Sequence, residues 1–195
     1  MNQKISLPIE ALEALKKGNE RFLNNLKMNR DYLQEVQATK DGQAPFAVII
    51  SCMDSRTSAE IIFDKGLGDL FSIRIAGNVV TPEVIASVEY ACKVVGSSLV
   101  VVLGHTGCGA VQGAINNVQL GQLNTILDRI KDNATFDKAT PPEKLQRMVT
   151  EENVKAGVVT LIEQSEVLRD LVNEAKIKIY GGIYDISTGE VSFWE

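Results

Sequence analysis

This sequence of 195 residues is poor in histidine, cysteine and tryptophan, with one, three and one of them respectively. Three cysteines are too few, and odd in number, for a disulfide framework; in a reducing compartment they favour metal binding or catalysis. The longest purely apolar runs, 46–50 and 99–103, are far shorter than the roughly 20 residues of a membrane-spanning helix. We therefore expect neither a disulfide scaffold nor a membrane protein.

The chain also lacks a basic stripe. Its 20 Lys and Arg are interspersed with 25 Asp and Glu, which gives a formal net charge of -5. Nucleic acid and anionic membranes are therefore not expected as partners. The start of the chain lacks the pattern of a secretory signal, so we expect a cytoplasmic protein.

No linker, repeat or low-complexity tract divides the sequence, so we expect one domain over residues 1–195, with residues 1–45 as an N-terminal helical arm. The tract 28–45 is polar and is expected to be largely irregular. Apolar periodicity and caps predict helices over 9–26, 58–65 and 82–96, and further helices around 110–132. A capping box at Thr140–Glu143 predicts one or two more helices up to about 174. Runs rich in β-branched residues predict strands over 46–51, 70–75, 98–103, 176–184 and 190–194. This alternation predicts an α/β fold: a mainly parallel central sheet flanked by helices, with a late antiparallel strand.

Polar residues that can bind a metal directly follow two of the most apolar predicted strands. They lie in Ser51–Arg56 and Gly104–Gly109. In an open parallel sheet the ligand crevice lies at the carboxyl ends of the strands, where the strand order reverses. If these strands are neighbours, Cys52, His105 and Cys108 meet there. Two thiolates and an imidazole suit zinc and leave the fourth tetrahedral position free for water or substrate.

Core packing is the ordinary role of a free cysteine at a strand end. For Cys52 the polar neighbours Asp54 and Arg56 argue against it. For Cys108 the nearby His105 and three glycines do the same. We therefore interpret both cysteines as candidate metal ligands.

We interpret Cys92 as a core-packing residue, because it lies in a predicted helix with no other candidate metal ligand nearby in the sequence. The glycines at 104, 107 and 109 suggest a phosphate-binding nest before a helix. No Gly-Lys-Ser/Thr follows them, which excludes a Walker loop. The Cys-x-x-Cys pair expected of a thiol oxidoreductase is also absent.

At these residues the sequence resembles the β-class carbonic anhydrases, which share Cys-x-Asp-x-Arg and, later in the chain, His-x-x-Cys. Here these motifs are Cys52–Arg56 and His105–Cys108. The resemblance covers nearly the whole chain and includes residues 18–22, 71–78, 87–91 and 180–185. It implies a zinc enzyme that reversibly hydrates carbon dioxide to bicarbonate and a proton, with zinc on Cys52, His105 and Cys108.

The resemblance also gives roles to Asp54 and Arg56. Zinc with two thiolates is formally neutral, and so acidifies water less than a three-histidine site does. The family pattern implies that Asp54 orients the zinc-bound hydroxide, which is the nucleophile, while Arg56 keeps Asp54 ionised. Asp54 is also a possible fourth ligand in a closed state, which Arg56 opposes. The alternative for the two residues is an ordinary structural ion pair.

A substrate pocket follows from the same resemblance. Gln43 matches a glutamine that hydrogen-bonds a substrate oxygen, and Gly109 is assigned to substrate binding beside Cys108. Phe71 and Tyr90 match aromatics that wall the pocket from across a dimer interface, although both residue types are more often ordinary core. The resemblance implies a homodimer or a dimer of dimers.

Two positions depart from the family pattern. Some bacterial members have a tryptophan where this chain has Ile49; with residues matching Arg74 and Tyr184, it forms an inhibitory bicarbonate site. Without the indole we expect no such site and an enzyme that stays open near neutral pH. Ile75 replaces a common asparagine, and we assign no consequence to that change.

Two other functions remain compatible with these residues. The same zinc site is similar to that of hydrolases of carbon disulfide or carbonyl sulfide. A non-catalytic zinc module for folding or redox sensing is the other alternative. Asp54 and Arg56 argue against the module, because a structural zinc site has no use for a carboxylate held by an arginine.

The single histidine leads to a kinetic prediction. If His105 binds zinc, no other imidazole remains to carry protons between the site and solvent. We expect the turnover of carbon dioxide hydration to rise with the concentration of an imidazole-type buffer at fixed pH and ionic strength. Stopped-flow rates that stay constant as this buffer is titrated contradict the prediction.

Overall fold

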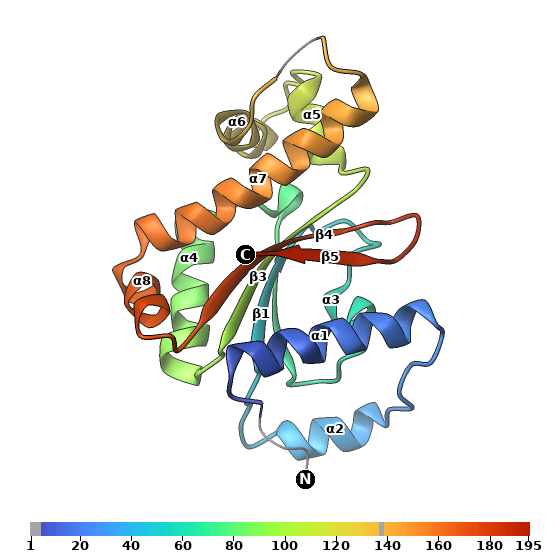
Figure 1. Ribbon diagram of the computed structural model, residues 1–195, viewed down its shortest axis with the longest axis vertical. Coiled ribbons are helices and arrows are strands. Elements are labelled where there is room, and N and C mark those ends of the chain that lie inside the picture. The colour runs from blue at the N-terminus through green and yellow to red at the C-terminus, as the bar shows by residue number, and fades with distance from the viewer. Residues whose placement is uncertain (1–4, 137–138) are drawn as a thin grey trace.

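The centre of the fold is a five-stranded sheet with the strand order β2-β1-β3-β4-β5 (Figure 1). The computed structural model describes residues 5–136 and 139–195; residues 1–4 of the predicted arm lie outside them. The first four strands in this order run parallel, and β5 is antiparallel to β4, as predicted. The strands are β1 (Ala47–Ser51), β2 (Leu70–Arg74), β3 (Leu99–His105), β4 (Lys178–Tyr184) and β5 (Val191–Trp194).

Helices connect and cover these strands. The α-helices are α1 (Pro8–Leu23), α2 (Tyr32–Thr39), α3 (Ala59–Ile62), α4 (Pro82–Glu89), α5 (Gly109–Ile115), α6 (Leu123–Asn133), α7 (Pro142–Gln164) and α8 (Glu166–Asn173). A short 3-10 turn, η1 (Ala76–Asn78), follows β2, and a π-helical turn, η2 (Tyr90–Val95), extends α4. Within the described ranges, none of the helices combines the length and apolarity needed to cross a bilayer.

Both faces of the sheet are covered, which explains why β1 and β3 are buried along their whole length and mostly apolar. Side chains alternate between the faces of a strand. Val48 and Ile50 of β1 pack with α4, α7 and α8 on one face. Ile49 and its β3 neighbour Val101 pack with α1 and α3 on the other. The central strands are therefore held by two cores at once.

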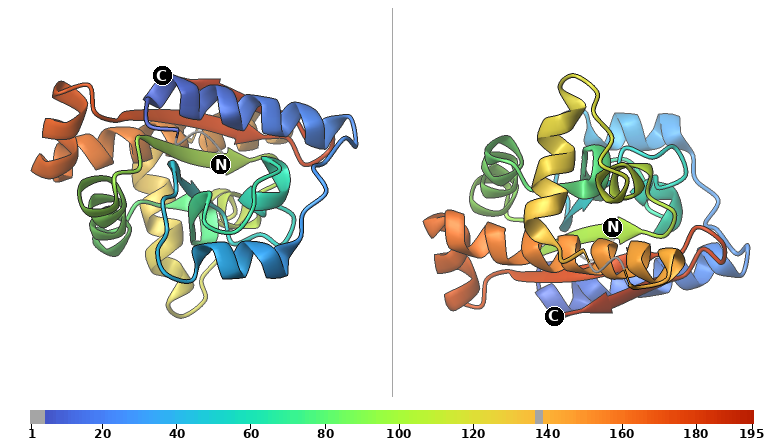
Figure 2. Two further views of the ribbon diagram at one scale, coloured as in Figure 1. Left: turned by 90° about the horizontal axis from the view of Figure 1, so that it is seen from below. Right: turned by 90° about the horizontal axis from the view of Figure 1, so that it is seen from above.

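The expectation of a largely irregular tract over 28–45 was wrong, because the tract contains α2. The Asp31 side chain caps this helix by accepting a hydrogen bond from the Gln34 main-chain N–H at 3.0 Å. None of the residues of α2 is buried, and both views of Figure 2 place it at the periphery. Since α2 buries nothing within the chain, the tract has no clear apolar stripe.

For the other helices, the observed boundaries differ from the predicted ones mainly at the ends. The helix predicted over 58–65 is a single turn, α3, whereas the helices predicted around 110–132 are present as α5 and α6. Thr81 caps α4 as its sequence suggests, accepting from the Val84 N–H at 3.4 Å. The last turn of this segment winds as a π-helix and ends at Gly96, whose φ of 94° is accessible to glycine.

A buried carboxylate ties the N-terminal segment to the rest of the fold. Asp64 accepts hydrogen bonds from Arg21 Nε at 2.5 Å and from the main-chain N–H of Met28. Its main-chain oxygen accepts from Arg30 at 2.9 Å. Burial opposes ionisation, but the hydrogen bonds from Arg21 and Met28 prevail and lower the pKa of Asp64.

We expect Asp64→Asn to lower the free energy of unfolding by about 1–3 kcal/mol at pH 7, because it weakens charge-assisted hydrogen bonds to a buried group. The matched control is Asp128→Asn in the more exposed pair with Lys131, with an expected change below about 0.5 kcal/mol. The folded-state pKa of Asp64 is lowered, so the difference is fully present above its unfolded pKa of about 4 and is lost as pH falls further. Urea unfolding should give the same loss of unfolding free energy for Asp64→Asn at pH 7 and at pH 5.5. An equal loss for Asp64→Asn and Asp128→Asn would contradict the anchoring role of Asp64.

Candidate metal centre

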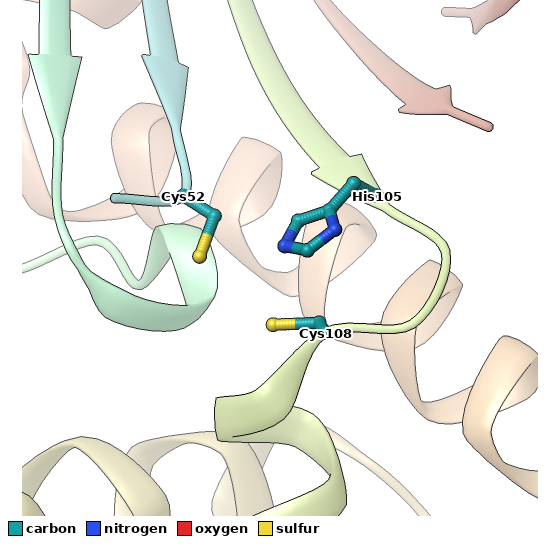
Figure 3. A group of neighbouring side chains, drawn as sticks. All are labelled: Cys52, His105 and Cys108. Atoms are coloured by element: carbon teal, nitrogen blue, oxygen red, sulfur yellow. The ribbon is translucent and has the colours of Figure 1, made fainter. Parts of the chain in front are cut away.

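Cys52, His105 and Cys108 meet where the strand order of the sheet reverses. The chain passes from β1 to β2 on one side of β1 and returns to β3 on the other, so the carboxyl ends of β1 and β3 form the switch point. Cys52 follows β1, and His105 is the last residue of β3. Potential ligand atoms of the three buried residues all lie within 4.8 Å of one another, with both sulfurs and the imidazole turned toward a common space (Figure 3).

The loop that carries Cys52 is fixed by hydrogen bonds to its main-chain oxygens. Thr57 Oγ1 donates to the carbonyl oxygens of Cys52 and Asp54, at 2.9 Å each. Arg74, from the end of β2, donates to the same two oxygens at 3.3 and 2.5 Å. Thr57 was not singled out from the sequence, because a threonine after a polar loop is common and only the folded loop shows its two acceptors.

The second loop turns sharply so that His105 and Cys108 face the same space. Gly107 makes this turn with a φ of 67°, in the left-handed region that favours glycine. The Thr106 N–H donates to the Tyr184 carbonyl at 3.0 Å, which fastens the loop to the end of β4. Gln146 of α7 donates to the Cys108 carbonyl at 3.3 Å.

The hydrogen bonding of His105 leaves one ring nitrogen available to a metal. His105 Nδ1 lies 2.9 Å from the Thr106 carbonyl oxygen, which can only accept, so Nδ1 carries the proton. Nε2 is buried and has no hydrogen-bond partner. A buried polar atom without a partner is costly, and a metal ion would satisfy it.

The two sulfurs interact strongly. Hydrogen bonding from the Cys108 side chain is the main cause that lowers the pKa of Cys52 to about 4, with smaller contributions from His105 and from the main-chain N–H groups of Asp54 and Gly77 at 3.4 Å each. The Cys52 thiolate and burial in turn raise the pKa of Cys108. The two thiols therefore do not ionise independently, and a divalent cation bound to both would favour their deprotonated forms. Two thiolates and one imidazole nitrogen fit zinc.

The third cysteine lies elsewhere. Cys92 is in η2 and belongs to the apolar cluster beneath α4, α7 and α8. Burial alone raises the pKa of its thiol to about 12. It is therefore a protonated core side chain at neutral pH.

Asp54 lies beside the metal group and is held by Arg56. Asp54 Oδ1 accepts from Arg56 Nε at 2.9 Å and from the Arg56 N–H at 3.0 Å, while Oδ2 accepts from Arg56 Nη2 at 2.7 Å. The Arg56 side-chain hydrogen bonds are the main reason why the pKa of Asp54 is far below its usual range. The carboxylate is not one of the three mutually close groups.

Three of the four residues assigned to substrate binding lie away from the metal group. Gln43 is exposed in the loop before β1, and the five residues of β1, about 17 Å long, separate it from Cys52. Phe71 and Tyr90 are in edge-to-face contact, with 6.4 Å between ring centroids. They line a surface cavity of about 370 Å³ at β2 and α4 that contains no residue of the metal group. Only Gly109, the first residue of α5, adjoins Cys108.

Comparisons with known proteins agree on one family. The model of the carbonic anhydrase family matches residues 47–191. Carbonic anhydrase 2 of Mycobacterium tuberculosis is 34% identical over 188 residues, which cover 93% of this chain and 90% of that protein. The carbonic anhydrase of Mycolicibacterium smegmatis is 32% identical over 192 residues, 95% of this chain and 93% of its own. A structure of tetrameric β-carbonic anhydrases from Sordaria macrospora superposes with a TM-score of 0.75 at 25% identity, covering 95% of this chain and 93% of that one.

The geometry predicts that the wild-type protein binds one zinc ion per chain and that Cys108→Ser weakens this binding by at least about a hundredfold, because it removes a thiolate ligand. The matched control is Cys92→Ser, which also changes a buried cysteine but leaves the metal group intact. The metal content of each purified protein gives the zinc stoichiometry, and competition with a chelator gives the zinc affinity of the wild type and of both variants. Wild-type affinity in Cys108→Ser, or an equal loss in Cys92→Ser, would be incompatible with the assignment.

Proposed function

This chain belongs to the β-class carbonic anhydrases, and on that basis we propose that it hydrates carbon dioxide reversibly to bicarbonate and a proton at the centre formed by Cys52, His105 and Cys108. The observation that carries the proposal is the convergence of these three donors beside a carboxylate that Arg56 keeps ionised. A purely structural zinc site has no need of that carboxylate.

The three donors would hold a zinc ion and leave its fourth tetrahedral position open. When bound, zinc supplies a water-derived nucleophile at neutral pH. The two thiolates cancel its formal charge, so neighbouring groups of the protein must assist the reaction.

Asp54 is the residue that gives this assistance. A carboxylate has about four lone-pair sites, and the hydrogen bonds from Arg56 occupy both on Oδ1 and one on Oδ2. The remaining site on Oδ2 can accept a hydrogen bond from the attacking water and so orient its oxygen toward the carbon of the substrate. Arg56 keeps Asp54 ionised and away from the metal, which maintains the open state.

Gln43, Phe71 and Tyr90 act from a second copy of the chain in this proposal. Support comes from their position in one chain, where Gln43 lies at the opposite end of β1 from Cys52 and the two aromatics line a surface cavity beside the edge strand β2. We therefore propose a homodimer or a dimer of dimers with each site completed across an interface. The thiolate ligands require a reducing environment, which supports a cytoplasmic location.

The presence of Ile49 instead of a tryptophan supports activity at neutral pH. The Ile49 side chain is fully buried between the sheet and α1. The inhibitory bicarbonate site would need a tryptophan at this position. Arg74 donates to the main-chain oxygens of Cys52 and Asp54, so its guanidinium is engaged in holding the loop. We therefore propose that Asp54 stays with Arg56 at pH 7.

Stopped-flow measurement of carbon dioxide hydration between about pH 6.5 and 9 tests the proposal, because this range brackets a zinc-activated water. We expect wild-type activity already at pH 7. Asp54→Asn should lower kcat about a hundredfold with zinc content unchanged, because the amide loses the charge and one acceptor. The matched control, Glu151→Gln in the exposed pair with Arg147, should leave kcat unchanged.

Each contrary outcome has its own meaning. Full activity in Asp54→Asn rules out the role of that carboxylate, and activity that begins only above pH 8 rules out an open site at neutral pH. Zinc binding without carbon dioxide turnover overturns the proposal and directs the search to carbon disulfide or carbonyl sulfide, which competition assays between the gases resolve.

A further inference from the structure

A backbone N–H from outside the two ligand loops points at the Cys52 sulfur. It belongs to Gly77 of η1, with 3.4 Å between the nitrogen and Sγ in a buried setting. The Gly77 carbonyl oxygen accepts a hydrogen bond at 2.8 Å from Asn153 Nδ2, contributed by α7 76 residues later in the chain. The side chain of Asn153 therefore fixes the residue whose N–H contacts a metal-ligand sulfur.

The conformation of Gly77 explains why it needs an external bond. Its φ is 64°, in the left-handed region, and a Cβ atom would lie 2.7 Å from Ile130 Cδ1 and 3.3 Å from Ala110 Cβ. Only glycine fits there, and glycine is also the residue with the most backbone freedom. The short η1 turn does not by itself remove that freedom, so the direction of the Gly77 N–H depends on what holds the rest of the residue.

Asn153 is itself held in one orientation. It is 1% exposed, and its Oδ1 accepts a hydrogen bond at 3.0 Å from Asn133 Nδ2, at the end of α6. Since the Gly77 carbonyl oxygen can only accept, the amide nitrogen of Asn153 must face it. Hydrogen bonds therefore run in one direction, from Asn133 through Asn153 to Gly77, and the Gly77 N–H then meets Cys52.

We infer that Asn153 is a positioning residue for the metal ligand Cys52, a role that rests on metal binding at the centre proposed above. By holding the Gly77 carbonyl it aims the N–H at Sγ, which places the thiolate and withdraws part of its negative charge. Contacts of this kind in the layer around metal ligands set affinity, and their loss typically costs ten- to a hundredfold in metal binding. Asn153 itself donates to no metal ligand in the hydrogen bonds of the described residues.

A purely structural role for Asn153 is the alternative, since its bond also joins α7 to η1. In that case its loss would lower the stability of the metal-free protein but would leave the metal–sulfur bond unchanged. The two roles are separated by measuring the metal–sulfur interaction directly rather than activity alone.

Two variants remove the donor. Asn153→Leu has similar volume and no polar atoms, and Asn153→Asp keeps the shape but places an oxygen against the Gly77 carbonyl. We expect the Kd for Zn²⁺, from chelator competition, to rise about tenfold or more in both. The sulfur-to-metal charge-transfer absorption of the Co²⁺-loaded protein should change as well. Asn133→Ala leaves Asn153 in place and should shift both readouts in the same direction by less.

The matched control is Asn19→Leu. Asn19 is also a buried amide, 4% exposed, and bridges main-chain groups of α1, α3 and the β5 region by donating to Ile62 and Gly189 and accepting from Val191. We expect it to lower the Tm of the metal-free protein about as much as Asn153→Leu does, with the Kd for Zn²⁺ and the Co²⁺ spectrum unchanged.

The outcomes distinguish this inference from the function on which it rests. Wild-type Zn²⁺ affinity and an unchanged Co²⁺ spectrum in the Asn153 variants would overturn the inference alone, as would an equal loss of affinity in Asn19→Leu. A wild-type protein that binds neither Zn²⁺ nor Co²⁺ would overturn the proposed function as well. If the Asn153 variants do not fold, Asn133→Ala decides by the same two readouts, and an unchanged Kd and spectrum there would overturn the inference.

Discussion

The parallel pairing of β1 with β3 is the constraint on which the rest of the structure depends. Its register places Ser51 beside Leu103, so that Cys52 and His105 leave the sheet next to each other. A pairing shifted by one residue would turn every side chain of a strand to the opposite face. The two cores on either side of the sheet prevent such a shift, because Val48 and Ile49 must each face their own set of helices. The packing of apolar side chains thus determines the relative positions of the metal-binding donors.

Buried polar atoms gather around these donors. In the part of the chain that the structure describes, five buried side-chain nitrogen or oxygen atoms lack a hydrogen-bond partner, and four belong to Ser51, Asn78 and His105. Ser51 precedes Cys52, and Asn78 follows the glycine whose N–H meets its sulfur. Unpartnered polar atoms are rare in well-packed interiors, and here they gather at the carboxyl end of the sheet. The same region holds two sulfurs that influence each other's ionisation and a carboxylate held by an arginine. The polar chemistry of the fold is therefore concentrated at this end of the sheet.

Much of this could be predicted from the sequence, because the strongest patterns belong to the most buried elements. The runs that became β1 and β3 are apolar since both of their faces are covered, and the polar residues after them mark the switch point of the sheet. Helix α2 escaped prediction for the opposite reason, as it buries no side chain. No local pattern could join Asn153 to Gly77, because the hydrogen bond spans 76 residues and depends on where α7 crosses the sheet. Likewise, Phe71 and Tyr90 line a surface cavity beside β2, and the order of elements in the chain does not reveal that β2 is an edge strand.

The position of α7 in the chain has a consequence for biosynthesis. All three donors lie between residues 52 and 108, and β1 and β3 complete the framework that joins them. The helix that covers this framework, with the side chains that contact Cys108 and Gly77, begins only at Pro142. Because a chain is synthesised from its N-terminus, the ribosome makes the ligands well before it makes their cover. The residues that hold the ligand loops against α7 are therefore among the last of the site to be synthesised.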